Sequence, residues 1–296
     1  MISSGLFILP GLAYVHAGPG VILSYMIAGF LALTGVLSHA ELVSAMPKAG
    51  GSYFFVTRSM GPAVGTIDGL IVWFSISLKS SFALIGMAAF THLFIDLDIN
   101  LTALTLCIFF TLINIAGVRE AGRFQVIIVM ALISLILMYI YSGVSRVDVN
   151  NLSPFAPHGV LSLFSTAGMV FVSYGGLLKV ASVAEEAKDP TRNVPLGMIM
   201  SLGIVSILYA LVIFVTTGVL GTKLGTTVES ATITPITDGA SAVMGRFGYY
   251  ALSVAAILAF VSTANAGIMS ASRYLLALSR DELIPGPFSK LSAKKG

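Results

Sequence analysis

Long apolar stretches, separated by short polar segments, recur along the whole chain. A helix needs about 20 predominantly apolar residues to cross the hydrocarbon core of a bilayer. The pattern predicts an all-α integral membrane protein with roughly eight spans, over residues 1–16, 19–45, 62–92, 99–117, 125–143, 160–184, 197–219 and 246–277.

Two of these predicted spans are interrupted by small and hydroxyl-bearing residues. The first interruption is Ser3-Ser4-Gly5 and the second is Ser173-Tyr174-Gly175-Gly176. An unwound backbone at membrane depth exposes N–H and C=O groups that only a solute, an ion or water satisfies. Interrupted segments in corresponding halves of a membrane protein are the best pointer to a transporter's binding site. We therefore predict that all the residues of both interruptions bind the substrate.

The chemistry of a helix break indicates what kind of solute it would hold. The N-terminus of a half-helix carries free N–H groups and a partial positive charge, which suits a carboxylate. The carbonyls that end the preceding half-helix suit an ammonium group or a sodium ion. Gly5 would allow the solute to approach the backbone closely.

Composition and charge support a membrane location and predict an orientation. The chain is 56% hydrophobic and only 10% charged, whereas soluble domains carry about 25% charged residues. If the N-terminal side is cytoplasmic, only Arg146, Lys223 and Arg246 lie outside and Lys79 and Lys179 lie within spans. The other Lys and Arg residues then face the cytoplasm, as the positive-inside rule requires. This use of basic residues gives no support for a nucleic-acid partner.

A few polar residues within the predicted spans are candidates for ion coupling. Lys79 lies near the middle of the third span, where an ionisable residue is by default a functional hypothesis. Its candidate roles are proton coupling or contact with a substrate carboxylate, and the alternative is burial beside a polar neighbour. Lys179 is closer to the cytoplasmic end, toward which its side chain can extend. Ser262 and Thr263 could complete a sodium site with their hydroxyl oxygens, or they could simply favour close helix packing.

Residues for catalysis are not visible in the sequence. The one cysteine, Cys107, lies in an apolar stretch, so neither a disulfide nor a thiolate metal site can form within the chain. We expect no enzyme activity and no cofactor, apart from Na⁺ or H⁺ as a coupling ion.

Five segments together resemble the amino acid–polyamine–organocation superfamily of secondary transporters, in its amino acid permease branch. They cover the first span, the turn after the second, the loop between the fourth and fifth, the sixth span with its exit, and the stretch after the eighth. Their sequences are ISSGLFILPG, AELVSAMPKAGGSYFFVTRSMGP, NIAGVREAGRFQ, FVSYGGLLKVASVAEEAKDPTRNVP and SRYLLALSRDELIP.

The resemblance implies a LeuT-type fold of two inverted repeats with discontinuous first and sixth helices. The whole chain, 1–296, would form one transmembrane transporter domain, with a first repeat in 1–143 and a partial second repeat in 160–296. Members of the family have about twelve spans, so we expect this chain to be truncated at both ends. Many proton-coupled relatives carry a Lys in the fifth span, and the corresponding stretch, Val129 to Leu132, has none. This departure leaves Lys79 or a sodium site at Ser262 and Thr263 as the coupling candidates.

The resemblance also implies a function. We expect a multi-pass plasma-membrane protein that moves an amino acid by alternating access, as an antiporter or symporter. The substrate carboxylate would meet the backbone around Ser3, Ser4 and Gly5, and its amino group would meet carbonyls near Ser173, Tyr174 and Gly175. A carrier of polyamines or other organic amines, and a nutrient-sensing permease that does not transport, are the alternatives. The sequence does not predict an oligomeric state.

Overall fold

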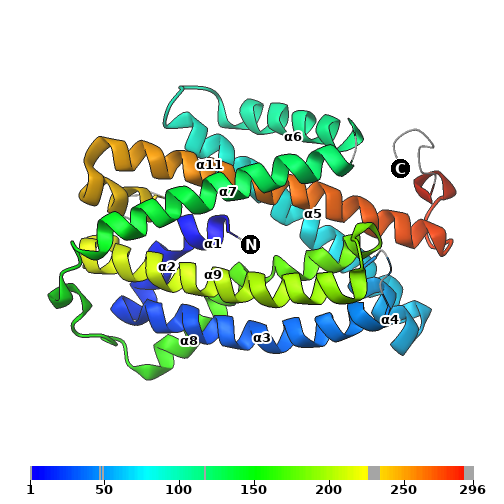
Figure 1. Ribbon diagram of the computed structural model, residues 1–296, viewed down its shortest axis with the longest axis horizontal. Coiled ribbons are helices and arrows are strands. Elements are labelled where there is room, and N and C mark those ends of the chain that lie inside the picture. The colour runs from blue at the N-terminus through cyan, green and yellow to red at the C-terminus, as the bar shows by residue number, and fades with distance from the viewer. Residues whose placement is uncertain (1, 47, 49, 117, 226–233, 290–296) are drawn as a thin grey trace. The chain divides into compact units, whose positions relative to one another are not determined.

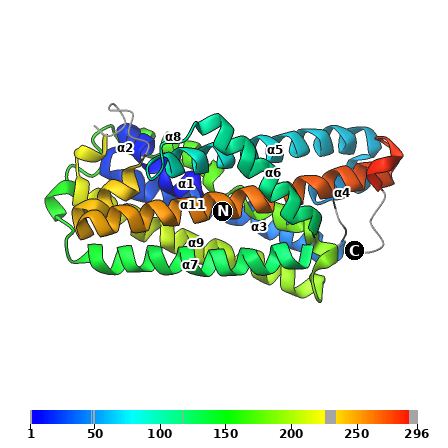
Figure 2. The same cartoon turned by 90° about the horizontal axis from the view of Figure 1, so that it is seen from above.

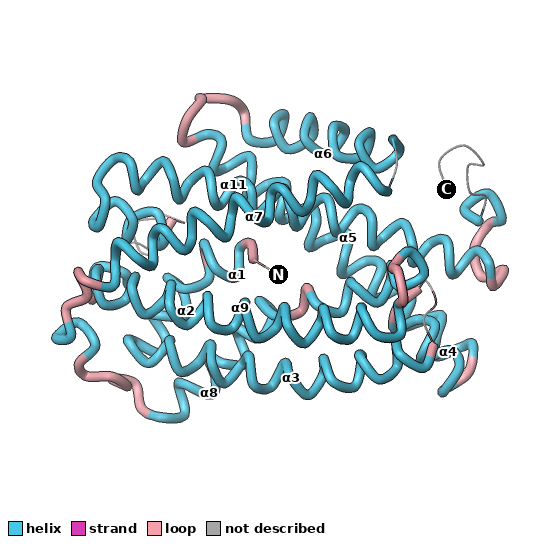
Figure 3. Tube along the Cα trace, in the orientation of Figure 1, coloured by secondary structure: helices cyan, strands magenta, loops and turns pink. Residues whose placement is uncertain are grey.

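The computed structural model describes residues 2–46, 48, 50–116, 118–225 and 234–289. Helices joined by short loops make up this part of the chain, and it contains no strand (Figure 3). The α-helices are α1 (Ser4–Phe7), α2 (Leu9–Ala17), α3 (Val21–Ala45), α4 (Ser52–Met60), α5 (Pro62–His92), α6 (Ile99–Ala116), α7 (Val118–Val144), α8 (Val160–Val170), α9 (Pro190–Leu220) and α11 (Pro235–Arg280). The 3₁₀-helices are η1 (Gly18–Gly20), η2 (Val149–Leu152), η3 (Phe171–Tyr174), η4 (Leu177–Glu186) and η5 (Gly286–Ser289).

The apolar stretches of the sequence are the helices of the structure. Among the described residues, 6 helical segments are long and apolar enough to cross a membrane: Leu9–Ala45, Pro62–His92, Gln125–Val144, Val160–Ser182, Pro190–Leu220 and Pro235–Arg280. The shorter apolar helix α6 corresponds to the predicted fourth span. Leu9–Ala45 covers most of the two spans predicted first, which η1 separates. The protein is therefore an all-α membrane protein, as predicted.

The chain divides into two compact units, each assembled from segments that are distant in sequence. Unit 1 contains the described residues of Met1–Thr34, Ile128–Gly175 and Leu202–Phe260. Unit 2 contains those of Gly35–Ile127, Gly176–Ser201 and Val261–Gly296.

In unit 1, the first helices of the chain pack against the segment that begins with α8. α2 lies against α8, and α1 lies against η3 (Figure 1). Ser24, near the start of α3, is fully buried and its hydroxyl donates a 2.9 Å hydrogen bond to the Leu163 carbonyl of α8. This packing places the first interruption and Ser173 to Gly175 of the second interruption within the same unit, whereas Gly176 belongs to unit 2.

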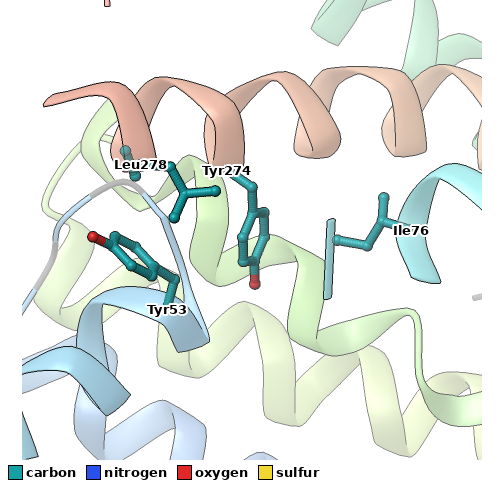
Figure 4. Packing of buried hydrophobic residues seen from close by; sticks show 5 residues of the cluster. Tyr53, Ile76, Tyr274 and Leu278 are labelled. Carbon is teal, nitrogen blue, oxygen red and sulfur yellow. The ribbon is translucent and has the colours of Figure 1, made fainter. Parts of the chain in front are cut away.

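In unit 2, α4 and α6 both pack against α5, and α5 and α6 run side by side (Figure 2). A buried cluster joins the end of α11 to α4 and α5. It contains Tyr53 of α4, Ile76 of α5, and Tyr274, Ala277 and Leu278 of α11 (Figure 4). Three segments separated by long stretches of sequence are thereby held together by one apolar contact.

Candidate functional site

The first interruption is the start of a helix. Ser3 precedes α1 with an extended backbone, at φ −165° and ψ −131°, and its side chain makes no capping hydrogen bond. Its carbonyl instead accepts hydrogen bonds from the N–H groups of Leu6 and Phe7, at 2.9 and 3.1 Å. The first N–H groups of a helix have no partner within the helix. Ser3 and Gly5 are buried, whereas Ser4 between them is exposed.

The second interruption is a change of helix type. α8 ends at Val170 and the chain continues as η3, then Gly175 and Gly176, then η4. Both glycines have negative φ angles, −63° at Gly175 and −75° at Gly176, so the break is a tightening into 3₁₀ turns. A 3₁₀ stretch in the middle of a helix often marks a hinge. Ser173 and Tyr174 are buried here and Gly175 is exposed.

The two interruptions touch each other within unit 1. A Cβ atom on Gly5 would lie 2.5 Å from Ser173 Oγ and 3.0 Å from Ser173 Cα. Only a residue without a side chain allows this approach, which explains the glycine. The Ser173 hydroxyl is buried. The Tyr25 hydroxyl lies close to it, but the Ser173 hydroxyl forms no hydrogen bond of good geometry with any described residue. A buried hydroxyl in this state favours a polar ligand or water.

Three buried tyrosines surround this contact, and two of them were not predicted from the sequence. The Tyr25 hydroxyl donates a 2.7 Å hydrogen bond to the Gly5 carbonyl. The Tyr174 hydroxyl donates a 2.9 Å hydrogen bond to the Tyr25 carbonyl. The Tyr209 ring meets both other rings edge-on, with centroids 5.6 Å from Tyr25 and 5.4 Å from Tyr174. The tyrosines thus connect both interruptions to α3 and α9, and the Tyr25 hydroxyl supports the backbone of the first interruption.

The remaining predicted residues, Gly176, Lys79, Ser262 and Thr263, belong to unit 2. There the Ser262 hydroxyl accepts a hydrogen bond from the Gln125 amide of α7. The Gln125 carbonyl oxygen accepts from Asn265 at 3.3 Å, and the Asn265 carbonyl oxygen accepts from Asn114 of α6 at 2.8 Å. This amide network satisfies polar groups between three helices. It occupies one acceptor position of the Ser262 hydroxyl, which has two.

The structure therefore brings some predicted site residues together. Gly5 meets Ser173 directly, and Ser3, Ser4, Tyr174 and Gly175 lie in the same unit. Tyr25 and Tyr209 were missed because a tyrosine in an apolar span is usually an ordinary core residue. Only its contacts in the folded protein show that it lies at the site. Gln125 was missed for the same reason, since its partner Ser262 is distant in sequence.

Comparisons with known proteins agree with this architecture. A family model described as "Amino acid permease" matches residues 1–296. The branched-chain amino acid permease BcaP of Bacillus subtilis is 30% identical, over 99% of this chain and 67% of that protein. The methylthioribose transporter of the same bacterium is 30% identical, over 98% of this chain and 66% of that protein. Cationic amino acid transporter 9 of Arabidopsis thaliana, a chloroplastic protein, is 31% identical over 98% of this chain and 54% of its own length. The chain thus spans between about half and two thirds of the length of these relatives.

Proposed function

The chain belongs to the amino acid permease family, and we propose that it is a secondary active transporter of amino acids. On this proposal the substrate lies at the two interruptions, and alternating access exposes that site to each side of the membrane in turn. The relatives are permeases and transporters, and the proposed role is accordingly transport without chemical change of the substrate.

The contact between Gly5 and Ser173 is the observation that carries this proposal. Because the two backbones abut, a solute as small as an amino acid can touch both interruptions at once. The N–H groups at the start of α1 suit the α-carboxylate. The Ser173 hydroxyl, together with carbonyls near Gly175, suits the amino group. Ser4 and Gly175, which are exposed in unit 1, offer backbone groups for these contacts.

The proposal extends to the fold and the orientation. We assign a LeuT-type arrangement, with a first repeat in 1–143 and a partial second repeat in 160–296, and a location in the plasma membrane with the N-terminal side cytoplasmic. The coupling ion is Na⁺ or H⁺. Lys79 is the candidate for proton coupling, and Ser262 and Thr263 are the candidates for sodium.

A different substrate class is the second candidate function. The methylthioribose transporter is named for a solute that is not an amino acid, and it is as similar to this chain as the branched-chain permease is. A carrier of polyamines or similar amines is a third candidate, and a nutrient sensor that does not transport is a fourth. Neither a methylthioribose carrier nor a polyamine carrier requires an α-carboxylate at the start of α1.

Ligand-induced thermal stabilisation of the purified protein separates the substrate classes. Each amino acid class, its methyl esters, polyamines and methylthioribose would be tested with sodium and with choline as the cation. A ligand at 100 times its Kd stabilises the fold by about 2.7 kcal/mol. We expect one class of amino acid to raise the melting temperature, and we expect its methyl ester to have no effect.

The outcomes distinguish the substrate classes and test the sodium site. A shift that survives esterification contradicts the carboxylate assignment. A shift with polyamines or methylthioribose alone replaces the amino acid with that substrate. A sodium requirement that is lost in Ser262→Ala and Thr263→Ala supports the sodium site, whereas its persistence in both variants removes those two residues from the proposal.

A further inference from the structure

A cavity of about 260 Å³ lies where two membrane-spanning segments of unit 2 end. It is formed by α4, the start of α5 and the residues that follow α11. The two segments are Pro62–His92 and Pro235–Arg280, and both Pro62 and Asp281 line the cavity. Lipid headgroups flank the hydrocarbon core that a spanning segment crosses. The cavity therefore lies at the depth of the headgroups.

Contacts within unit 2 hold the walls of this cavity in place. α4 ends at Gly61, whose φ of +88° lets the chain turn directly into α5. A Cβ atom on Gly65 of α5 would lie 1.9 Å from Thr57 Oγ1 of α4, so the two helices touch here. The Asp281 N–H donates a 3.2 Å hydrogen bond to the Ala277 carbonyl. The last turn of α11 thereby sets the position of Asp281.

The cavity is lined by one cationic and one anionic side chain, Arg58 and Asp281. The Arg58 guanidinium lies over the Phe54 ring, 5.2 Å from its centroid. Asp281 Oδ2 accepts a 2.5 Å hydrogen bond from the Tyr53 hydroxyl. Each charge is thus held by an aromatic side chain of α4, and the part of the chain that the structure describes shows no ion pair between them. A carboxylate accepts about four hydrogen bonds, so Asp281 has capacity for a further donor.

Opposite charges in one cavity suit a ligand that carries both charges. A guanidinium binds phosphate with two parallel hydrogen bonds. A carboxylate accepts charge-assisted hydrogen bonds from a primary ammonium, whereas a quaternary ammonium has no N–H to donate. Phosphoethanolamine carries a phosphate and a primary ammonium, so it matches Arg58 and Asp281 at once.

Exposed apolar side chains follow the cavity along α5. Ile67, Leu70 and Phe74 are 60%, 43% and 59% exposed, and their spacing of three and four residues places them on one stripe of the helix. Met60, the last residue of α4, is 69% exposed. An acyl chain attached to a headgroup in the cavity would find an apolar surface beside it.

We propose that the cavity between Arg58 and Asp281 binds the phosphoethanolamine headgroup of a membrane phospholipid. This site uses no residue of the two interruptions, and it does not depend on which solute the protein transports.

Lipid-dependent stability of the purified protein tests this proposal. The protein would be depleted of lipid in an uncharged detergent, and its unfolding would be followed by the fluorescence of Trp73, the single tryptophan. Trp73 packs against the buried cluster that contains Tyr53. Dioctanoyl phospholipids with ethanolamine, choline or glycerol headgroups would be compared at equal concentration. We expect the ethanolamine lipid to raise the melting temperature saturably by about 2–5 °C, and the other two to raise it by less than about half as much.

The free headgroup separates the two sources of this chemistry. Glycerophosphoethanolamine carries the same charges without acyl chains, and we expect it to give a smaller shift than the lipid. A shift as large as that of the lipid would overturn the lipid as the ligand and assign the cavity to a soluble phosphoethanolamine compound.

Matched variants connect the shift to the two charges, with each shift measured from the variant's own melting temperature without lipid. Arg58→Gln should need at least a fivefold higher concentration of every phospholipid for the half-maximal shift. Asp281→Asn keeps an acceptor for Tyr53, and it should lose the preference for ethanolamine over choline. Arg192→Gln changes an exposed arginine outside the cavity and should respond as the unchanged protein does. Equal shifts with all three lipids in the unchanged protein, or an unaltered ethanolamine response in either cavity variant, would overturn the proposal.

Discussion

A single methyl group distinguishes alanine from glycine at position 5, and Ser173 occupies the space that this group would need. Gly5→Ala would bring Cβ to 2.5 Å from Ser173 Oγ, so the two interruptions must separate. We expect at least a tenfold loss of substrate affinity, measured by ligand-induced thermal shift, while the protein still inserts into membranes.

Two further variants control this experiment. Gly168→Ala lies in the same unit on α8, where a Cβ meets nothing within 4 Å, and it should bind normally. Ser173→Gly in the Gly5→Ala background removes the atoms that clash most closely, so it should recover part of the lost affinity. Normal binding by Gly5→Ala would remove this contact from the site.

Single residues also show where sequence reasoning reaches its limit. Gly5 and Ser173 were predicted because small polar residues are conspicuous in an apolar span. Tyr25 gave no such signal, because its hydroxyl finds the Gly5 carbonyl only after the chain has folded. A hydrogen bond between distant segments depends on their packing, which no local pattern encodes.

At the scale of elements, a hydrogen bond outside the apolar segments links α4 to the residue that follows α11. The Tyr53 hydroxyl donates to Asp281 Oδ2 at 2.5 Å. Burial first, and then the Asp281 carboxylate, raise the pKa of Tyr53 from 10.0 to about 12. Because the folded state favours the protonated phenol, this contribution to stability is complete below pH 10 and is lost as the pH rises through about 12.

Tyr53→Phe should therefore lower the free energy of unfolding at pH 7 by about 1–2 kcal/mol. Thermal unfolding at a series of pH values checks both parts of this expectation. The difference between the two proteins should be constant from pH 7 to 9 and should shrink above pH 10. A difference that does not change up to pH 11 would show that the phenol proton is not responsible.

Elements also differ in how far the sequence predicts them. The boundaries of α5 coincide with the predicted span 62–92, since a long apolar run between Gly61 and the polar residues after His92 is a local signal. The winding of the sixth span was not predicted. Its interruption suggested an unwound, non-helical backbone, whereas η3 and η4 keep the segment helical with 3₁₀ turns.

At the scale of the whole molecule, the distribution of Lys and Arg predicts which loops face the cytoplasm. Lys188 and Asn150 are both exposed and lie in loops predicted on opposite sides of the membrane. In a Cys107→Ser background, Lys188→Cys should react with a membrane-impermeant maleimide only after the cells are permeabilised. Asn150→Cys should react in intact cells, and the reverse pattern would invert the orientation.

The winding of η4 has a consequence for length. A 3₁₀-helix rises about 2.0 Å per residue and an α-helix about 1.5 Å, so the 10 residues of Leu177–Glu186 span about 20 Å rather than about 15 Å. Rewinding this segment into α-helix would shorten it by about 5 Å and would also rotate each side chain about its axis. Lys179 belongs to this segment, and its amine lies beside Gly267 of α11. A change of helical pitch alone would therefore move this amine away from Gly267, without the breaking of a loop or the bending of a hinge.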